Sequence, residues 1–305
     1  MSSSKMECNL PSMKPELLLQ SDKNVKALDF FIHNDMLMAT GLVNNDVELW
    51  DLRGDVTTYS LEGHHAEVTD VKFSLSGHLL ASSSKDKSVI IWEVLKRQRK
   101  YSFATHLEPV RSVQFSPNDM QIITASDDRS IHIYSHEKRK LACRLAGHKD
   151  HVLCAMMSDD STQIASCSVD QNIRFWDANT TKCIYRYEYL SGYGNNLAWL
   201  PGTKFLGVGT SLGKLKLFDT RTHNTAQFYS LHTAPITQLA FHPKKKYIVT
   251  ASKDGTLKVV DLNMGKPLYS LDSTSNAAKN AVSYSKSGAF IAAATSDRLV
   301  AIWKT

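Results

Sequence analysis

Short runs of alternating apolar and polar residues recur along this chain, and turn residues close each run. The segments "VTDVKF" (68–73), "VRSVQF" (110–115) and "ITQLAF" (236–241) share apolar residues at the first, fourth and sixth positions. A second run such as "LLASSSKD" follows, then a third that usually carries an aromatic residue, and then a looser fourth such as "KYSF". Such patterns bounded by turns are typical of strands, so each unit is predicted to contain four short antiparallel strands.

A large residue in the third strand recurs every 42 residues, with one final step of 43. A constant period of this length indicates a repeat architecture, and four strands per repeat describe the blades of a propeller. We therefore predict an all-β chain that folds as a single seven-bladed β-propeller, with no helix of useful length. The recurring residues are Trp50, Trp92, Tyr134, Trp176, Phe218, Val260 and Trp303.

The last repeat holds only three of its four strands. Residues 15–20, "PELLLQ", are similar to the fourth-strand segment "KPLYSLD" (266–272), so we expect them to pair with the last blade and close the ring. Residues 1–14 are expected to form a flexible N-terminal tail, and residues 15–305 the propeller. Its repeats are predicted near 20–61, 62–103, 104–145, 146–187, 188–229, 230–271 and 272–305.

A histidine, a serine or threonine, an aspartate and often a tryptophan recur in register with the repeat. A hydrolytic triad is needed once and requires an exposed nucleophile with an oxyanion hole, whereas a repeated set favours a structural hydrogen-bond network. The chain is therefore predicted not to be an enzyme. The network residues are His64, Ser82, Asp86 and Trp92; His106, Thr124 and Asp128; His148, Ser166, Asp170 and Trp176; and His232, Thr250 and Asp254.

Repeats one, five and seven depart from this set. Asn44 and Leu212 stand where the aspartate is expected, and Val208 and Ala293 replace the serine. We expect these three blades to depend more on apolar packing.

Composition excludes several classes of function. The net charge of +6 is mild for 305 residues and far below that of a dedicated nucleic-acid binder. The five cysteines include no CxxC pair, which argues against a zinc cluster or a disulfide framework. No signal-peptide layout or membrane-length apolar run is present. We expect an intracellular protein with no cofactor, metal or small-molecule substrate, and with no nucleic-acid or membrane partner.

Turns of a propeller alternate between two rims, and each rim offers candidate partner-binding residues. The first rim is predicted to present Lys85, Asp127, Lys253, Glu67 and Tyr193. Tyrosine is favoured at interaction hot spots. The tyrosines near Tyr193 either serve a partner or fill the core of a blade that lacks its polar network.

The opposite rim collects three basic runs. These are either solvated loops or a patch for an acidic protein surface, which suits them better than nucleic acid because no aromatic residues interleave them. The residues are Lys96, Arg97, Arg99 and Lys100; Lys138, Arg139 and Lys140; and Lys244, Lys245 and Lys246.

The segments "GHHAEVTDVKFSLSGHLLASSSKDKSVIIWEV" and "GHKDHVLCAMMSDDSTQIASCSVDQNIRFWD" resemble the tryptophan-aspartate (WD) repeat family. More closely, "EPVRSVQFSPNDMQIITASDDRSIHIY" and "YIVTASKDGTLKVVDLNMGKPLYSL" are similar to the proteome-of-centriole WD-repeat proteins. That resemblance implies a non-catalytic scaffold of centrioles, basal bodies or cilium axonemes that binds and stabilises microtubules. Tubulin and centriolar or axonemal proteins would then be its partners, the cytoplasmic cytoskeleton its location, and the basic rim its tubulin contact.

The family resemblance also implies a linker and a carboxy-terminal coiled coil after the propeller. We expect that oligomerising module to be absent or to lie outside this sequence. A second hypothesis rests on "VELWDLR" (47–53), which contains the string Trp50-Asp51-x-Arg53. Substrate receptors of cullin-type ubiquitin ligases use such a string, so a receptor role is the alternative to the scaffold.

Overall fold

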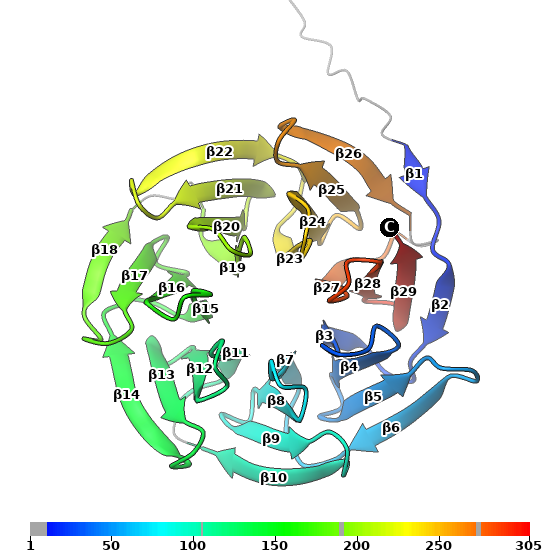
Figure 1. The fold of residues 1–305 in the computed structure, drawn as a ribbon, viewed down its shortest axis with the longest axis horizontal. Helices are drawn as coiled ribbons and strands as arrows, with labels where there is room; N and C mark the ends of the chain where they lie inside the picture. Colours follow the sequence, from blue (N-terminus) through cyan, green and yellow to red (C-terminus); the bar gives the residue numbers. More distant parts are fainter. Residues whose placement is uncertain (1–10, 105, 189–191, 273–275) are drawn as a thin grey trace, which may run out of the picture.

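The fold is known from a computed structural model, which describes residues 11–104, 106–188, 192–272 and 276–305. Seven sheets are arranged in a ring like the blades of a propeller (Figure 1), and the innermost strands of blades 2 to 6 line a central cavity of about 160 Å³, called the channel below. Within the described residues the regular structure consists of strands without helices. The same part of the chain holds no helical segment that could cross a membrane. The predicted seven-bladed, all-β architecture is confirmed.

The strands of each blade follow one another from the channel outward, in antiparallel pairs. Blade 1 contains β3 (Val25–Phe30), β4 (Leu37–Leu42), β5 (Val47–Asp51) and β6 (Thr57–Leu61). Blade 2 contains β7 (Val68–Phe73), β8 (Leu79–Ser84), β9 (Val89–Glu93) and β10 (Gln98–Phe103). Blade 3 contains β11 (Val110–Phe115), β12 (Gln121–Ser126), β13 (Ser130–Ser135) and β14 (Lys140–Ala146). Blade 4 contains β15 (Val152–Met157), β16 (Gln163–Ser168), β17 (Ile173–Asp177) and β18 (Cys183–Tyr187).

The remaining blades continue this order. Blade 5 contains β19 (Gly194–Trp199), β20 (Phe205–Thr210), β21 (Lys214–Asp219) and β22 (Asn224–Ser230). Blade 6 contains β23 (Ile236–Phe241), β24 (Tyr247–Ser252), β25 (Leu257–Asp261) and β26 (Lys266–Leu271), with β1 (Ser12–Met13) added outside β26. Blade 7 contains β27 (Lys279–Tyr284), β28 (Phe290–Thr295) and β29 (Leu299–Lys304), and β2 (Leu17–Gln20) completes it.

The ring is closed by the N-terminal segment, as predicted. Strand β2 runs antiparallel to β29, with Leu17 opposite Ile302. Strand β1 pairs in parallel with β26, and the indole of Trp303 donates a hydrogen bond to the carbonyl of Met13 at 3.1 Å. Ser12 and Met13 therefore belong to blade 6, although the sequence placed them in a flexible tail. The rest of that expected tail, residues 1–10, lies outside the described residues.

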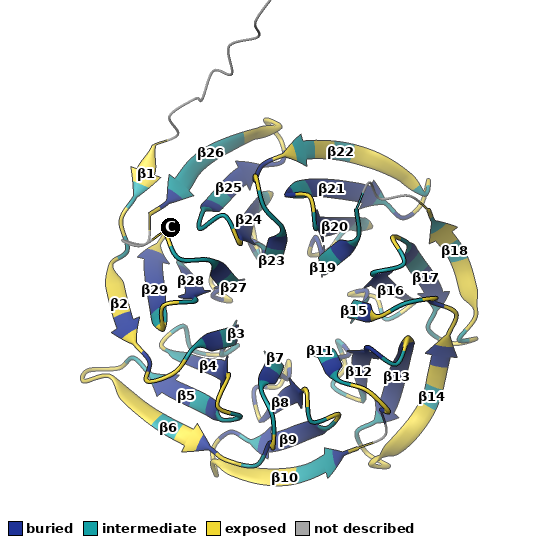
Figure 2. Cartoon of the chain, turned by 180° about the vertical axis from the view of Figure 1, so that it is seen from behind, coloured by how far each residue is buried: buried dark blue, intermediate teal, exposed yellow. Residues whose placement is uncertain are grey.

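Burial is greatest in the second strand of each blade and least in the outermost strand. All six residues of β8 are buried, because neighbouring blades cover both faces of the second strand. The outermost strands, such as β10, expose half or more of their residues (Figure 2). Seven separate apolar clusters occupy the seven junctions between blades. The core therefore lies between the blades, and no blade buries its faces alone.

Side chains that line the channel side tie most blades to the next one. An oxygen of each accepts a hydrogen bond from a backbone N–H of the following inner strand, which satisfies a donor facing the narrow channel. The pairs are Asp29 with Phe73 (3.0 Å), Asp70 with Val113 (3.1 Å), Gln114 with Met157 (3.0 Å), Asn196 with Leu239 (3.3 Å) and Gln238 with Val282 (3.0 Å).

Candidate functional site

Blade 2 contains a complete chain of polar contacts. His64 Nδ1 lies 2.9 Å from Asp86 Oδ2, and His64 Nε2 lies 2.8 Å from the hydroxyl of Ser82. The indole of Trp92 donates to that same hydroxyl oxygen at 2.8 Å. Because a carboxylate only accepts, His64 Nδ1 carries the proton and its Nε2 accepts from Ser82. Every polar atom in this chain of contacts therefore has a partner with a neutral imidazole.

Three other blades repeat this arrangement. In each, the histidine lies between the aspartate and the hydroxyl, which places the contact at the turn between the second and third strands. The distances from histidine to aspartate and to hydroxyl are 2.8 and 2.7 Å for His106, Asp128 and Thr124; 2.9 and 2.8 Å for His148, Asp170 and Ser166; and 3.2 and 2.8 Å for His232, Asp254 and Thr250. Trp176 donates to Ser166 at 2.9 Å.

The carboxylates of this network stay ionised. Burial alone would raise the pKa of Asp86, but hydrogen bonds from His64, Ser88 and the His65 amide outweigh burial and lower the pKa below its usual range. The same balance lowers the pKa of Asp128, Asp170 and Asp254. Ser82 is fully buried, so a substrate has no access to its hydroxyl. The geometry suits a clamp that holds the turn in place.

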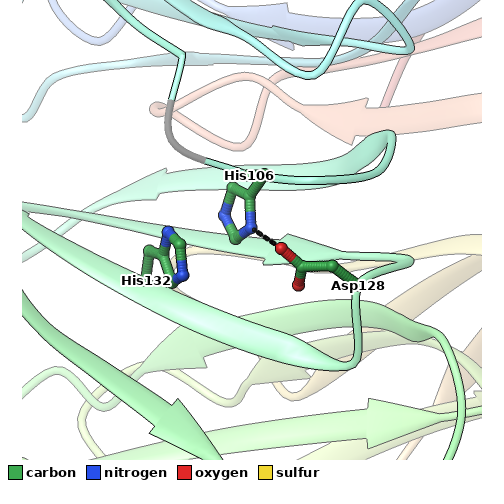
Figure 3. A group of neighbouring side chains, drawn as sticks. All are labelled: His106, Asp128 and His132. Atoms are coloured by element: carbon green, nitrogen blue, oxygen red, sulfur yellow. Dashed lines mark hydrogen bonds and ion pairs between the residues drawn. The ribbon is translucent and has the colours of Figure 1, made fainter.

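Blade 3 carries an additional histidine that the sequence analysis missed. His132 stacks on His106 with ring centroids 3.8 Å apart and planes 12° apart (Figure 3). Their nitrogens and the Asp128 carboxylate lie within 4.8 Å of one another, which resembles a metal-ligand set. Lone pairs lie in the plane of each ring, so two parallel stacked rings do not aim them at a common ion. Burial, followed by the neighbouring His106, lowers the pKa of His132 to about 4, which keeps the ring neutral.

The blades with degraded networks use other contacts. In blade 1, the indole of Trp50 donates to the Thr40 hydroxyl at 2.9 Å. In blade 7, a fully buried lysine, Lys279, begins the inner strand where other blades have Val, Ile or Gly. Burial lowers the pKa of Lys279, while Asp297 opposes this most strongly among the nearby carboxylates. In blade 5, Lys216 lies over the ring of Tyr187 at 5.9 Å.

On the first rim, two groups of charges form. Glu67 pairs with Lys85 at 2.6 Å and with Lys26 at 3.7 Å. Asp127 is buried beneath a two-pronged contact from Arg111, whose closest approach is 2.6 Å. Arg111 was not predicted, although a basic residue at the second position of an inner strand was a usable signal. Among the other predicted residues, Lys253 is exposed and Tyr193 is half-buried.

On the opposite rim, the first two basic runs mostly contact their own neighbours. The Arg97 guanidinium lies over the Tyr59 ring, 3.3 Å from its centroid. Glu93 pairs with Lys96 at 2.7 Å and with Lys100 at 3.6 Å. In the same way Arg139 lies over Tyr101, and Arg99 donates to Ser102. Lys138 and Lys140 are exposed, as are Lys244, Lys245 and Lys246.

The short string around Arg53 forms a local contact. Its guanidinium makes a two-pronged bond to Asp51, at 2.9 and 2.6 Å, and hydrogen bonds from Arg53 lower the pKa of Asp51 to about 2. Arg221 and Asp219 make the same pair in blade 5. Because the same pair occurs in two blades, the contact neither supports nor excludes a cullin partner. The cullin-receptor alternative stays a prediction.

The fold defines the class: this chain is a seven-bladed β-propeller, and part of it matches WD40 repeats. Three segments, 56–93, 97–135 and 139–177, match the family model of the WD domain, G-beta repeat. Residues 196–303 match a second model, that of the Nucleolar protein 10-like, N-terminal domain.

Curated relatives are similar over part of the chain. Ribosome biogenesis protein YTM1 of Scheffersomyces stipitis is 34% identical over 32% of this chain and 22% of its own length. U3 small nucleolar RNA-associated protein 12 of Saccharomyces cerevisiae is 33% identical over 30% of this chain and 10% of its own. Target of rapamycin complex subunit wat1 of Schizosaccharomyces pombe is 31% identical over 29% and 28%. This chain therefore covers well under two thirds of the length of each relative.

The predicted location in the cytoplasmic cytoskeleton, at centrioles, basal bodies or cilium axonemes, is wrong. The matching domain model and two of these relatives are named for the nucleolus or for ribosome biogenesis. The cause is physical, because the segments that suggested centriolar proteins consist of strands, turns and clamp residues. These features are needed to form a blade whatever the propeller binds. They therefore identify the fold and give no information about the partner.

Proposed function

We propose that this chain is a non-catalytic scaffold that holds proteins together in a nucleolar ribosome-assembly or RNA-processing complex. The observation that carries this proposal is the match of residues 196–303 to the Nucleolar protein 10-like domain. The similarity to YTM1 and to U3 small nucleolar RNA-associated protein 12 supports the same setting. Because the location has been corrected, tubulin and centriolar partners are not part of the proposal.

The geometry supports a scaffold rather than an enzyme. The recurring histidine, serine and aspartate groups are buried and hydrogen-bonded to one another. Their role is therefore to stabilise the blades. The polar groups that face solvent lie on the rims, where turns from several blades present them together. Within the proposal, the Glu67 and Lys85 pair, Lys253 and Tyr193 contribute to a protein-binding surface on the first rim, and the buried Asp127 holds Arg111 there.

Location and co-sedimentation test this proposal. A fluorescently tagged copy should coincide with a nucleolar marker in dividing cells, and the untagged protein should sediment with pre-ribosomal particles in a sucrose gradient. A double variant that reverses two charges of the first rim, Lys85→Glu with Lys253→Glu, should keep the fold and reduce the fraction of protein bound to particles. Diffuse cytoplasmic signal with sedimentation as a free monomer would contradict the proposal.

A further inference from the structure

A stacking contact repeats at the outer edge of the junctions between blades. One partner is a residue of the outer strand, and the other is a turn residue of the next blade at the rim of the basic runs. Both positions recur every 42 residues. The outer-strand residues are Tyr59, Tyr101, Cys143, Tyr185 and Gln227, and the turn residues are Arg97, Arg139, Thr181, His223 and Gly265.

Three of these junctions are filled by a ring and a nitrogen-bearing side chain. The Arg97 guanidinium lies 3.3 Å from the centroid of Tyr59, and Arg139 lies 5.1 Å from that of Tyr101. His223 stacks on Tyr185 at 4.1 Å, with an angle of 16° between the planes. The turn residues all have positive φ, at 53°, 49° and 56°, so the turn has the same shape each time. Each stack closes the space between two blades.

The junction between blades 5 and 6 has the same turn but lacks the plug. Gly265, with φ 66°, occupies the turn position, and a Cβ placed on it meets no atom within 4 Å. Gln227 replaces the tyrosine and donates to the carbonyl of Leu262 at 3.0 Å. A groove of about 360 Å³ remains there, and its walls are largely apolar: Leu200, Phe205, Leu217, Ala226 and Leu262. Gln227 lines this groove, so it adjoins the position that a tyrosine occupies at three other junctions; between blades 3 and 4, Cys143 and Thr181 hold the two positions.

A basic segment borders this groove. Lys244, Lys245 and Lys246 are exposed, and Lys246 itself lines the groove. No ion pair joins any of the three to an acidic residue of the described chain, in contrast to Lys96 and Lys100, which share Glu93. Lys245 lies over the ring of Tyr247 at 5.7 Å, and none of the three charges is neutralised by a carboxylate in the described residues. A largely apolar groove beside a cationic edge without carboxylate partners complements a segment that has an apolar side chain and acidic neighbours.

We propose that the groove between blades 5 and 6 binds an acidic protein segment, whose one bulky aliphatic side chain enters the groove while its carboxylates pair with Lys244, Lys245 and Lys246. The partner's side chain takes the place of the missing plug. This inference rests on the proposed scaffold function and assigns it a second contact surface, on the rim opposite to Lys253. Nucleic acid is disfavoured, because Phe205 is the one aromatic residue that lines the groove and bases would find few rings to stack on.

The test fills the groove in the way the neighbouring junctions do. A short fluorescein-labelled peptide with one central leucine between two runs of glutamate is the probe, and fluorescence anisotropy measures binding. Gly265→Arg with Gln227→Tyr recreates the stack seen between blades 1 and 2. A side chain at positive φ is strained, so this variant should melt somewhat lower, by an amount similar to the control below, and should weaken peptide binding by about tenfold or more. Gly54→Arg is the matched control, since Gly54 also has positive φ and open space around it.

Two further comparisons separate the contributions of charge and shape. Reversing Lys244, Lys245 and Lys246 to glutamate should abolish binding, whereas reversing Lys96, Lys138 and Lys140 should leave it unchanged. Replacing the peptide's leucine by serine, or its glutamates by glutamine, should each weaken binding. Equal affinity for the filled variant, absence of peptide binding, or stronger binding of an oligouridine RNA would overturn the proposal.

The peptide measurement is independent of cellular location. Suppose that the protein binds the peptide, loses binding in the filled variant, and does not enter the nucleolus. The groove proposal would then stand and the proposed nucleolar complex would be rejected. A nucleolar location without peptide binding would support the proposed complex and reject the groove as a binding site.

Discussion

His132 differs from its counterparts in a way that spacing alone does not reveal. It lies opposite Thr124 in the sheet, and Ile90 lies opposite Ser82 at the same place in blade 2. The clamp residues were predictable because they recur with the blades. His132 and Lys279 were not, because each occurs once and its protonation depends on the groups folded around it. Burial, His106 and Arg144 lower the pKa of His132, and Asp128 opposes them.

This histidine should make stability depend on pH. Its pKa is about 4 in the folded protein and about 6.5 in an unfolded chain, so the unfolded state binds the proton first. The stabilisation is fully present above pH 6.5 and is lost as pH falls toward 4, by roughly 3 kcal/mol. In urea unfolding between pH 7 and pH 4.5, His132→Ile should reduce the pH slope of the unfolding free energy. An unchanged slope would show that the ring is not buried in its neutral form.

At the scale of elements, the closing strand was foreseen and its neighbour was not. Strand β2 carries an apolar pattern similar to the fourth strand of blade 6, and the incomplete last repeat needed such a strand. Strand β1 has only two residues and pairs through its backbone, so no pattern of side chains in the sequence predicts it. Together they attach the beginning of the chain to the last two blades.

Two adjacent leucines of β2 allow a matched test of ring closure. Leu19 is 6% exposed and packs into the cluster between blades 7 and 1, whereas Leu18 is 43% exposed. Leu19→Ala should lower the free energy of unfolding by about 2–4 kcal/mol, because it removes buried apolar volume. Leu18→Ala should change it by less than about 0.5 kcal/mol. Chemical denaturation measures both, and equal effects would argue that β2 is not a closing strand.

At the scale of the whole molecule, the number of blades followed from the period, because each repeat leaves two apolar faces that only neighbouring blades can cover. The contacts that link blades were harder to foresee. Whether Arg97 serves a partner or stacks on Tyr59 depends on how two residues far apart in the sequence meet across a junction. Function was predicted least well, since the residues that specify a WD repeat are mostly those that build it.

The channel-side hydrogen bonds predict how strongly blades are coupled. Gln238→Leu leaves the Val282 N–H without its acceptor at the junction of blades 6 and 7, and an unsatisfied buried donor costs about 1–3 kcal/mol. The variant should unfold at lower temperature, and hydrogen exchange should accelerate first at the Val282 amide. Ala240→Ser, on the same strand, is the control with no such bond. Unchanged exchange at Val282 would mean that this bond does not couple the blades.

The pairing of β2 with β29 also sets an order of events during synthesis. Leu17 leaves the ribosome early, but its partner Ile302 is made near the end of the chain printed above. At roughly 5–20 residues per second, the wait is on the order of 15–60 s. During that interval the face of blade 1 that packs on blade 7 in the folded protein has no neighbour. The unpaired leucines of β2 can then bind chaperones or pair with the wrong strand edge. Slow translation should therefore burden this protein more than a fold whose ends pair locally.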